Sequence, residues 1–174
     1  RDKVVKTLIK NGLLIDPANQ VQAYLNLILE DGKVVAVTEE EPEADRVIDA
    51  TGKVVAPGFI DIHMHEDPVK DGKIEFCIFD AMLRMGVTTA VGGNCGINVY
   101  DPVKYLDMVE KDGAPVNVML FAGHQYFREA AGALDKYAPV TKEQQEHMKK
   151  GLEKALEAGC VGISYGLRYV PGTG

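Results

Sequence analysis

Hydrophobic and polar residues follow two different patterns along this chain, and the change comes near residue 57. Before it, short runs rich in valine, isoleucine and leucine are separated by turn pairs such as Asn11-Gly12 and Asp31-Gly32. Both residues of such a pair tolerate a positive φ, which two-residue hairpin turns require. Residues 1–56 therefore predict a small antiparallel β unit in which Asn11-Gly12 is a hairpin turn. Its expected strands are residues 7–10, 13–15, 23–29, 33–37, 47–50 and 54–56.

From residue 57 the pattern becomes strand, helix and strand, repeated at intervals of about 30 residues. Apolar residues at helical spacing predict helices over 73–85, 102–111 and 142–158. Buried apolar runs predict strands over 58–65, 87–92, 116–122 and 161–165. Strands that alternate with helices are typical of a parallel sheet, so residues 57–174 predict an α/β fold of about four strands and three helices.

The segment PGFIDIHMH, residues 57–65, begins this second pattern and carries two of the four histidines. Side chains alternate along a strand, so Asp61, His63 and His65 are expected to share one face. Two imidazoles on a strand with an apolar opposite face suit a metal site. Two histidines at this spacing also occur by chance on a half-exposed strand, and the spacing alone leaves both interpretations open. For Asp61 we favour a structural or orienting hydrogen bond over ligation.

Functional groups in a βα architecture collect at the carboxyl ends of the strands. Cys95 follows the second predicted strand in a glycine-flanked turn, where a thiol is not packed as a core residue would be. We therefore favour a metal-ligand role for Cys95, whereas Cys77 and Cys160 are interpreted as small buried side chains. Glu66 and Asp67 have two open interpretations, as partners that fix imidazole tautomers or as ordinary loop acids.

His124 follows the third predicted strand and precedes Arg128 by about one helical turn, which allows both to face the mouth of a pocket. A loop histidine with satisfied hydrogen bonds is an equally good interpretation of His124. His147 lies among charged residues of a predicted helix and is expected at the surface.

Composition and net charge limit the partners and the cellular location that we expect for this protein. The net charge of −7 and the pI of about 5.1 argue against nucleic acid and anionic membrane surfaces as partners. No apolar run approaches the roughly 18 residues of a membrane span. Three cysteines without disulfide spacing favour a reducing, cytoplasmic location. The chain starts at Arg1 and stops in a loop at Gly174, so we expect a piece of a longer protein.

Several segments, in this order, resemble the amidohydrolase superfamily and, within it, the D-aminoacylase (N-acyl-D-amino-acid deacylase) family. TLIKNGLLIDP and VIDATGKVVAPGFIDIHMHED are similar to the N-terminal β-sandwich and first barrel strand of the superfamily. GVTTAVGGNCG resembles the second-strand segment, whose cysteine distinguishes the D-aminoacylase branch. GHQYFR resembles a GHxxxR segment after strand three, and GISYGLRYVPG resembles the fourth-strand segment.

The resemblance covers nearly the whole chain and implies both a fold and site residues. The implied fold is the N-terminal part of a metal-dependent (β/α)8 TIM barrel over residues 57–174, preceded by β-sandwich strands over residues 1–56. Cys95 resembles the tight zinc ligand of the family, and His63 with His65 resembles the pair at the adjacent, weaker metal position. The implied cofactor is Zn2+ at one tight site, with a second and weaker site left open.

The resemblance also implies substrate contacts from three residues. Tyr169 resembles a tyrosine that helps to hold the acyl-amino-acid substrate, and His124 and Arg128 match the GHxxxR pattern. Residues 125–127, QYF, depart from the small residues common there, which leaves the acyl-side preference open.

The implied reaction is hydrolysis of an N-acyl-D-amino acid to a carboxylate and a free D-amino acid. The two further zinc histidines and the catalytic aspartate of the family would lie beyond residue 174, so no catalytic residue is assigned here and residues 1–174 alone are expected to be inactive. Another amidohydrolase, such as a dihydroorotase, hydantoinase or isoaspartyl dipeptidase, is one alternative. A non-catalytic half-barrel assembly module is the other, and a fragment of this kind is expected to self-associate through its open edges.

Overall fold

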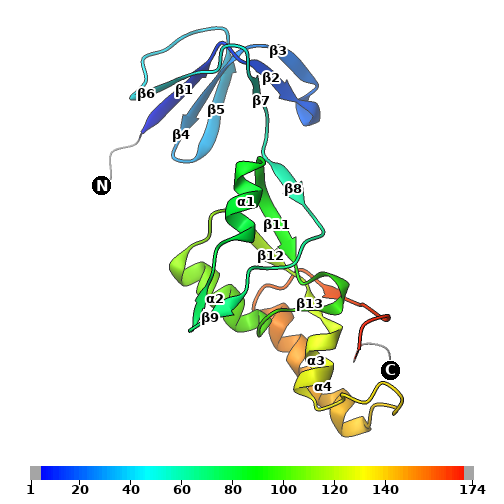
Figure 1. Cartoon of the computed structure of the whole chain (residues 1–174). Helices are drawn as coiled ribbons and strands as arrows, with labels where there is room; N and C mark the ends of the chain where they lie inside the picture. Colours follow the sequence, from blue (N-terminus) through cyan, green and yellow to red (C-terminus); the bar gives the residue numbers. More distant parts are fainter. Residues whose placement is uncertain (1–4, 171–174) are drawn as a thin grey trace. The chain divides into compact units, whose positions relative to one another are not determined.

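The structure is a computed structural model that describes residues 5–170. The chain divides into two compact units, Arg1–Pro57 and Gly58–Gly174. Figure 1 labels the elements of both, a β unit first and an α/β unit second.

The β unit consists of seven short strands and one 3-10 turn. They are β1 (Lys6–Lys10), β2 (Leu13–Asp16), η1 (Pro17–Asn19), β3 (Val21–Tyr24), β4 (Asn26–Glu30), β5 (Lys33–Thr38), β6 (Arg46–Asp49) and β7 (Val54–Val55). One sheet has the order β5-β4-β1-β6, and the other has the order β3-β2-β7. β1 pairs in parallel with β6, and β2 pairs in parallel with β7, so the prediction of a wholly antiparallel unit is wrong.

The two turn pairs of this unit have different roles. Asn11-Gly12 is not a hairpin turn, because β1 and β2 on either side of it belong to different sheets. Gly12 is buried there, and a Cβ on it would lie 2.5 Å from the Val55 side chain. Asp31-Gly32 forms the predicted turn, and this turn is a hairpin, since Glu30 pairs with Lys33 and the turn residues have φ of 48° and 71°. The predicted strand 23–29 is interrupted at Leu25, where β3 ends and β4 begins.

Four parallel strand segments lie in chain order in the α/β unit. They are β8 (Phe59–Asp61), β11 (Val87–Gly92), β12 (Asn117–Leu120) continued by β13 (Ala122–Gly123), and β14 (Ile163–Ser164). β11 pairs in parallel with β8 and β12, and β13 pairs in parallel with β14. Backbone hydrogen bonds from Val161 to Leu120 (2.8 Å) and from Ala122 to Gly162 (2.9 Å) extend the last pairing. The predicted parallel arrangement is therefore present.

Four helices accompany these strands, and the described residues thus hold one more than predicted. They are α1 (Ile78–Arg84), α2 (Pro102–Asp112), α3 (His124–Ala130) and α4 (Lys142–Glu157). α2 and α4 agree closely with the predicted helices, and the Thr141 hydroxyl caps α4 by accepting from the Gln144 amide N–H at 3.2 Å. The seven-residue α3 has no predicted counterpart, because a single turn or two gives too little periodicity to detect.

Two boundaries before α1 differ from the prediction. Strand β8 ends at Asp61, so His63 and His65 lie in the loop after it rather than on its face. The segment that was expected to open a helix at residue 73 instead forms a hairpin of β9 (Val69–Lys70) and β10 (Lys73–Ile74). The Asp71-Gly72 turn joins these two strands, with φ of 50° and 74°.

The core of the α/β unit lies between its sheet and its helices. Residues from these elements that are at most 1% exposed include Phe79, Ala90, Tyr105, Leu120, Ala122 and Ala155. The fold is mixed α/β, and residues 5–170 do not form a closed barrel. Among the described helices, none combines the length and the apolar character that crossing a membrane would take.

Candidate metal site

Cys95 occupies a strained turn at the carboxyl end of β11. It has φ of 58° and ψ of 20°, the left-handed conformation, inside the short 3-10 turn η2 (Asn94–Gly96). This conformation costs a residue with a Cβ about 1–2 kcal/mol relative to the right-handed region. Such strain persists where surrounding contacts hold the backbone in place. The contacts around this turn come from three other parts of the α/β unit.

The Asn94 side chain fixes the turn to the loop after β8. Its amide nitrogen donates to the carbonyl oxygen of Val91 at 2.8 Å and to that of Met64 at 3.3 Å. Asn94 is buried, and it is thus a structural link between the cysteine turn and the loop that carries both candidate histidines.

Ser164 at the end of β14 holds the turn from the opposite side. Its hydroxyl accepts a hydrogen bond from the Gly96 N–H at 3.0 Å and donates one to the carbonyl oxygen of Gly93. The backbone of Gly166 then packs against Cys95 so closely that a Cβ on Gly166 would overlap the Cys95 carbonyl oxygen. The fourth strand segment therefore helps to shape the second.

His63 lies against Cys95. The distance from Cys95 Sγ to His63 Nε2 is 3.4 Å. The backbone N–H of His63 donates to Asp61 Oδ1 at 3.0 Å, which gives Asp61 the structural role that we favoured. Zinc with one thiolate at about 2.3 Å and one imidazole at about 2.0–2.1 Å in tetrahedral geometry separates those two ligand atoms by about 3.5 Å. The observed pair of donor atoms fits two neighbouring ligands of one zinc ion.

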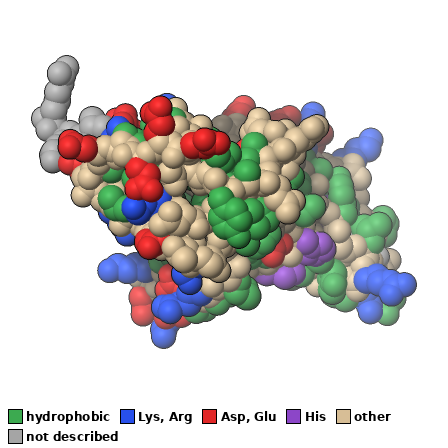
Figure 2. Space-filling view, turned by 90° about the horizontal axis from the view of Figure 1, so that it is seen from above, with side chains coloured by type: hydrophobic (Ala, Val, Ile, Leu, Met, Phe, Trp, Pro, Cys, Tyr) green, Lys and Arg blue, Asp and Glu red, His purple; other side chains and the backbone are tan. Residues whose placement is uncertain are grey.

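The structure does not bring the other candidate ligand into this pair. His65 is exposed, and across residues 5–170 no group of three or more histidine, cysteine, aspartate or glutamate side chains is placed to hold a metal ion. Figure 2 shows histidine side chains reaching the molecular surface. The described residues thus offer a soft thiolate and imidazole donor set, which suits zinc, but they offer it as a pair.

His124 begins α3 and packs against Tyr165, which follows β14. The two ring centroids are 5.1 Å apart and the rings are inclined by 39°. Both residues border a pocket of about 190 Å³ between α3, α4 and β14. Burial, and then the charge of the buried Arg128, lower the pKa of the His124 imidazole. His124 is therefore held towards its neutral form beside an aromatic wall.

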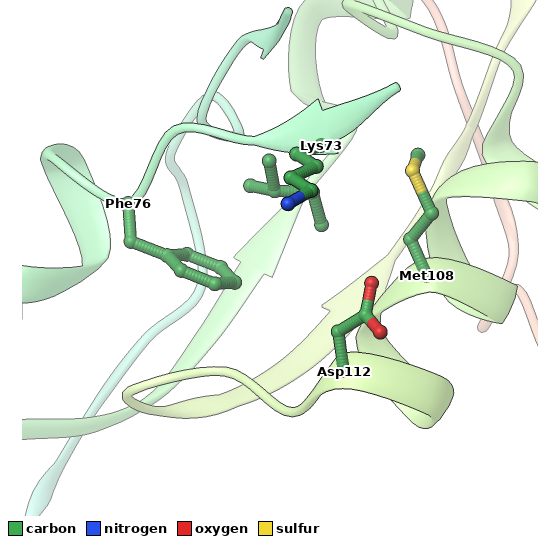
Figure 3. Close-up of a pocket in the computed structure, with 5 residues that line it drawn as sticks. Lys73, Phe76, Met108 and Asp112 are labelled. Carbon is green, nitrogen blue, oxygen red and sulfur yellow. The ribbon is translucent and has the colours of Figure 1, made fainter. Parts of the chain in front are cut away.

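Of the other predicted positions, Tyr169 lies near the cysteine turn, because a Cβ on Gly166 would contact both the Cys95 carbonyl oxygen and, at 2.7 Å, Tyr169 Cδ2. Tyr169 is 48% exposed in the turn after β14, where its N–H donates to the Gly166 carbonyl oxygen at 3.0 Å. His147 is exposed on α4, as expected, and borders a groove of about 570 Å³ between α2, α3 and α4. A pocket of about 240 Å³ at β10 and α2 contains none of the candidate ligands; Figure 3 shows Lys73 and Asp112 among its lining residues.

Two of the cysteines have different surroundings. Cys160 is buried as predicted, and burial raises the pKa of its thiol to about 11. Cys77 is exposed, so its interpretation as a buried side chain is wrong. Its Sγ donates to Asp67 Oδ1 at 3.0 Å, and this hydrogen bond raises the pKa of the Cys77 thiol.

Glu66 and Asp67 are both buried, and their hydrogen bonds go to other groups than imidazoles. Asp67 accepts from the N–H groups of Ile78 (2.6 Å) and Phe79 (2.9 Å) and thereby caps α1. Glu66 accepts from the Gly93 N–H and from the Asn98 side chain. The sequence reasoning missed Asn98 and Ser164 as supports of the site. Both act through partners that are distant in the sequence, 32 residues away for Asn98 and Glu66 and 71 residues away for Ser164 and Gly93.

Comparison with known proteins gives matches over most of the chain. The profile of the Amidohydrolase family matches residues 46–168. The chain is 31% identical to an N-acyl-D-glutamate deacylase from Alcaligenes xylosoxydans xylosoxydans over 95% of its own length and 38% of that protein. It is 30% identical to a D-aminoacylase from the same organism over 94% of its length and 38% of that protein. The chain thus spans about two fifths of these relatives.

A solved structure gives the same comparison in three dimensions. The crystal structure of N-acyl-D-glutamate deacylase from Bordetella bronchiseptica, complexed with zinc and a phosphonate inhibitor that mimics the tetrahedral intermediate, superposes with a TM-score of 0.82 at 31% identity. The match covers 98% of this chain and 40% of that one. The likeness therefore extends over both units of the chain.

Proposed function

Because this chain belongs to the amidohydrolase family, we propose that the complete protein is a zinc-dependent hydrolase of N-acyl-D-amino acids. The observation that carries the proposal is the 3.4 Å separation of Cys95 Sγ and His63 Nε2 at the carboxyl ends of parallel strands. Relatives that act on N-acyl-D-glutamate and other D-aminoacyl substrates support the choice of substrate class. In the reaction, the C–N bond of the amide breaks while water supplies a hydroxyl group to the acyl carbon and a proton to the amine nitrogen, which leaves as the free amino acid.

The residues of this chain have distinct roles in the proposal. Cys95 and His63 would hold the zinc ion, whereas the resemblance had placed His63 beside His65 at the adjacent position; the 3.4 Å distance between Cys95 Sγ and His63 Nε2 supports this change, and His65 remains the candidate for the second position. Zinc supplies Lewis acidity towards water and towards the acyl carbonyl group. His124, which burial and Arg128 hold towards its neutral form, would contact the substrate without adding a charge. Tyr169 and Arg128 remain the other proposed substrate contacts, and the substrate is a small molecule.

The remaining half of a (β/α)8 barrel is part of the same proposal. The four parallel strand segments in chain order support residues 58–174 as its first half, since barrel strands follow one another in this way. A catalytic zinc normally has three protein ligands and one open position. Residues 5–170 bring two donors together, so we propose that residues 1–174 alone do not turn over substrate.

The test is a measurement of zinc and stereospecificity on the complete protein. We expect the complete protein to copurify with zinc and to hydrolyse N-acetyl-D-methionine in strong preference to N-acetyl-L-methionine. Cys95→Ala should abolish the tightly bound zinc, whereas Cys77→Ala, at an exposed cysteine whose thiol bonds to Asp67, should retain it. Equal zinc in the Cys95→Ala protein would remove the ligand assignment. Equal turnover of both enantiomers, or turnover of dihydroorotate or hydantoin instead, would remove the substrate class.

One observation favours the alternative that residues 1–174 form a non-catalytic assembly module. Phe59, Ile60 and Ile62 at the edge strand β8 are 68%, 64% and 71% exposed. Exposed apolar residues on an unpaired strand edge promote pairing with another chain. If assembly is the function, residues 1–174 should form stable dimers in sedimentation experiments, and an Ile60→Lys/Ile62→Lys variant should be monomeric. A monomer at micromolar concentration in the unmodified chain would exclude this alternative.

A further inference from the structure

The Glu66 carboxylate is 2% exposed and is surrounded by hydrogen-bond donors. Oε2 accepts from the Gly93 N–H at 2.9 Å, and Oε1 accepts from Asn98 Nδ2 at 3.0 Å. Gly93 immediately precedes the turn that carries Cys95. Glu66 immediately follows His65 in the loop after β8. One buried carboxylate thus joins the histidine loop to the cysteine turn.

Asn98 extends this link to the third strand. Its Nδ2 also donates to the Phe121 carbonyl oxygen at 3.0 Å, and its Oδ1 accepts from the Gly123 N–H at 2.7 Å. Gly123 is followed directly by His124. The Glu66–Asn98 pair therefore fixes the carboxyl ends of β11 and β12–β13 and the loop after β8 relative to one another.

We propose that Glu66 and Asn98 are positioning residues of the metal site, which set where the Cys95 sulfur lies relative to His63. The inference rests on the proposed function in that it assigns the metal to this pair of donors. Buried polar groups that orient metal ligands without touching the metal commonly change metal affinity by about 10- to 100-fold when they are replaced. Ser164 complements the pair from the side of β14.

The Glu66–Asn98 hydrogen bond needs an acceptor at position 66 and a donor at position 98, so changing either residue alone breaks it. Glu66→Gln replaces one acceptor oxygen with an NH2 group, which would face either the Gly93 N–H or the Asn98 NH2 group. Asn98→Asp places a second carboxylate against Glu66. In the Glu66→Gln/Asn98→Asp double variant the new amide donates to the new carboxylate, and the Gly93 and Gly123 N–H groups keep acceptors. The double variant loses the bond to the Phe121 carbonyl oxygen and places a carboxylate oxygen against it, so it restores the link between positions 66 and 98 but not the contact with Phe121.

The first readout needs no metal. Hydrogen exchange of the metal-free complete protein is followed by mass spectrometry on the peptide that spans residues 92–98. Each single variant should exchange faster there, by about tenfold or more, because a bond to a buried charged acceptor is lost. Peptides of the β unit should be unchanged, and so should every peptide of Glu75→Gln, a control at an exposed carboxylate. The double variant should recover most of the protection.

The second readout is titration with Co2+, whose bond to a thiolate gives a charge-transfer absorption band. We expect a band that disappears in Cys95→Ala, and an affinity for Co2+ that is about 10- to 100-fold lower in each single variant. The double variant should regain most of that affinity. Rescue of this kind distinguishes positioning from general destabilisation.

The outcomes separate the two proposals. Absence of a Cys95-dependent band in the unmodified protein would reject the ligand assignment, and hydrogen exchange would still decide the role of the pair. Single variants with unchanged hydrogen exchange and unchanged affinity for Co2+ would overturn the inference. A double variant whose losses in protection and affinity equal the sum of the losses in the two single variants would also overturn it. If a single variant fails to fold, the double variant decides, because the restored link between positions 66 and 98 predicts that it folds and exchanges more slowly at residues 92–98 than the remaining single variant.

Discussion

The backbone of Gly166 lies directly against the carbonyl oxygen of Cys95, with no space for a side chain between them. Gly166→Ala would force these two segments apart, and inserting atoms into closely packed protein costs about 1–3 kcal/mol. We expect a lower midpoint of urea unfolding and a loss of tightly bound zinc. Gly162→Ala is the matched control, because its Cβ would make ordinary contacts of 3.4 Å with the Phe121 ring. A Gly166→Ala protein with unchanged zinc content would show that the packing does not place Cys95.

Asp67 and Asp101 each cap a helix, and the two carboxylates differ in how deeply they are buried. Asp67 is 0% exposed and accepts from the first N–H groups of α1, whereas the half-buried Asp101 accepts from Val103 (3.0 Å) and Lys104 (3.2 Å) at the start of α2. Asp67→Ala should lower the free energy of unfolding by about 2 kcal/mol, and Asp101→Ala by about 1 kcal/mol. Chemical denaturation of both variants checks the order. A larger loss in the free energy of unfolding for Asp101→Ala would contradict the expectation that the more buried carboxylate contributes more to stability.

His124 should make stability depend on pH. Its pKa is lowered in the folded protein, first by burial and then by Arg128, so the unfolded chain binds a proton at a higher pH than the folded one. The stabilising contribution is therefore complete above the unfolded pKa of about 6.5 and is lost as the pH falls through the folded pKa. Urea midpoints measured between about pH 7 and pH 5 should fall less steeply in His124→Gln. An identical slope in both proteins would show that His124 does not titrate in this range.

Tyr169 offers a test of substrate binding. Removing one hydrogen bond to a bound substrate weakens binding by about 0.5–1.5 kcal/mol, which corresponds to a rise in KM of about two- to tenfold. Tyr169→Phe in the complete protein should show this rise for an N-acyl-D-amino acid, with little change in kcat. Tyr137→Phe, at a tyrosine that is 85% exposed, should leave both constants unchanged. Unchanged kinetics of Tyr169→Phe would remove that residue from the substrate site.

The alternation of strands and helices could be predicted because it depends on local patterns. Continuous apolar runs predict β11 and β12, and helical spacing with Thr141 as the cap predicts α4. The Asn11-Gly12 turn could not be assigned in the same way. Its local preference is the same in a hairpin and in a crossing between sheets, and the choice depends on distant residues such as Val55, which packs against Gly12.

The residues of the candidate site could likewise be predicted only in part. Residue types and strand ends were enough to single out His63 and Cys95, which lie side by side. The role of Glu66 was not accessible, because it depends on Asn98, 32 residues further along the chain. Ser164 was equally hidden, since its partner Gly93 is separated from it by 71 residues. Supports of this kind are contacts between segments, and a single sequence contains no local signal for them.

The contacts of Ser164 and Gly166 also set an order of events during synthesis. The cysteine turn is encoded at residues 93–96, but two of the hydrogen bonds that hold it come from the Ser164 hydroxyl. A nascent chain must therefore extend about 70 residues past Cys95, and leave the ribosome to that point, before the turn can be completed. Until then the cysteine turn lacks the two hydrogen bonds from Ser164, so the proposed metal site cannot be complete before the fourth strand segment has been made.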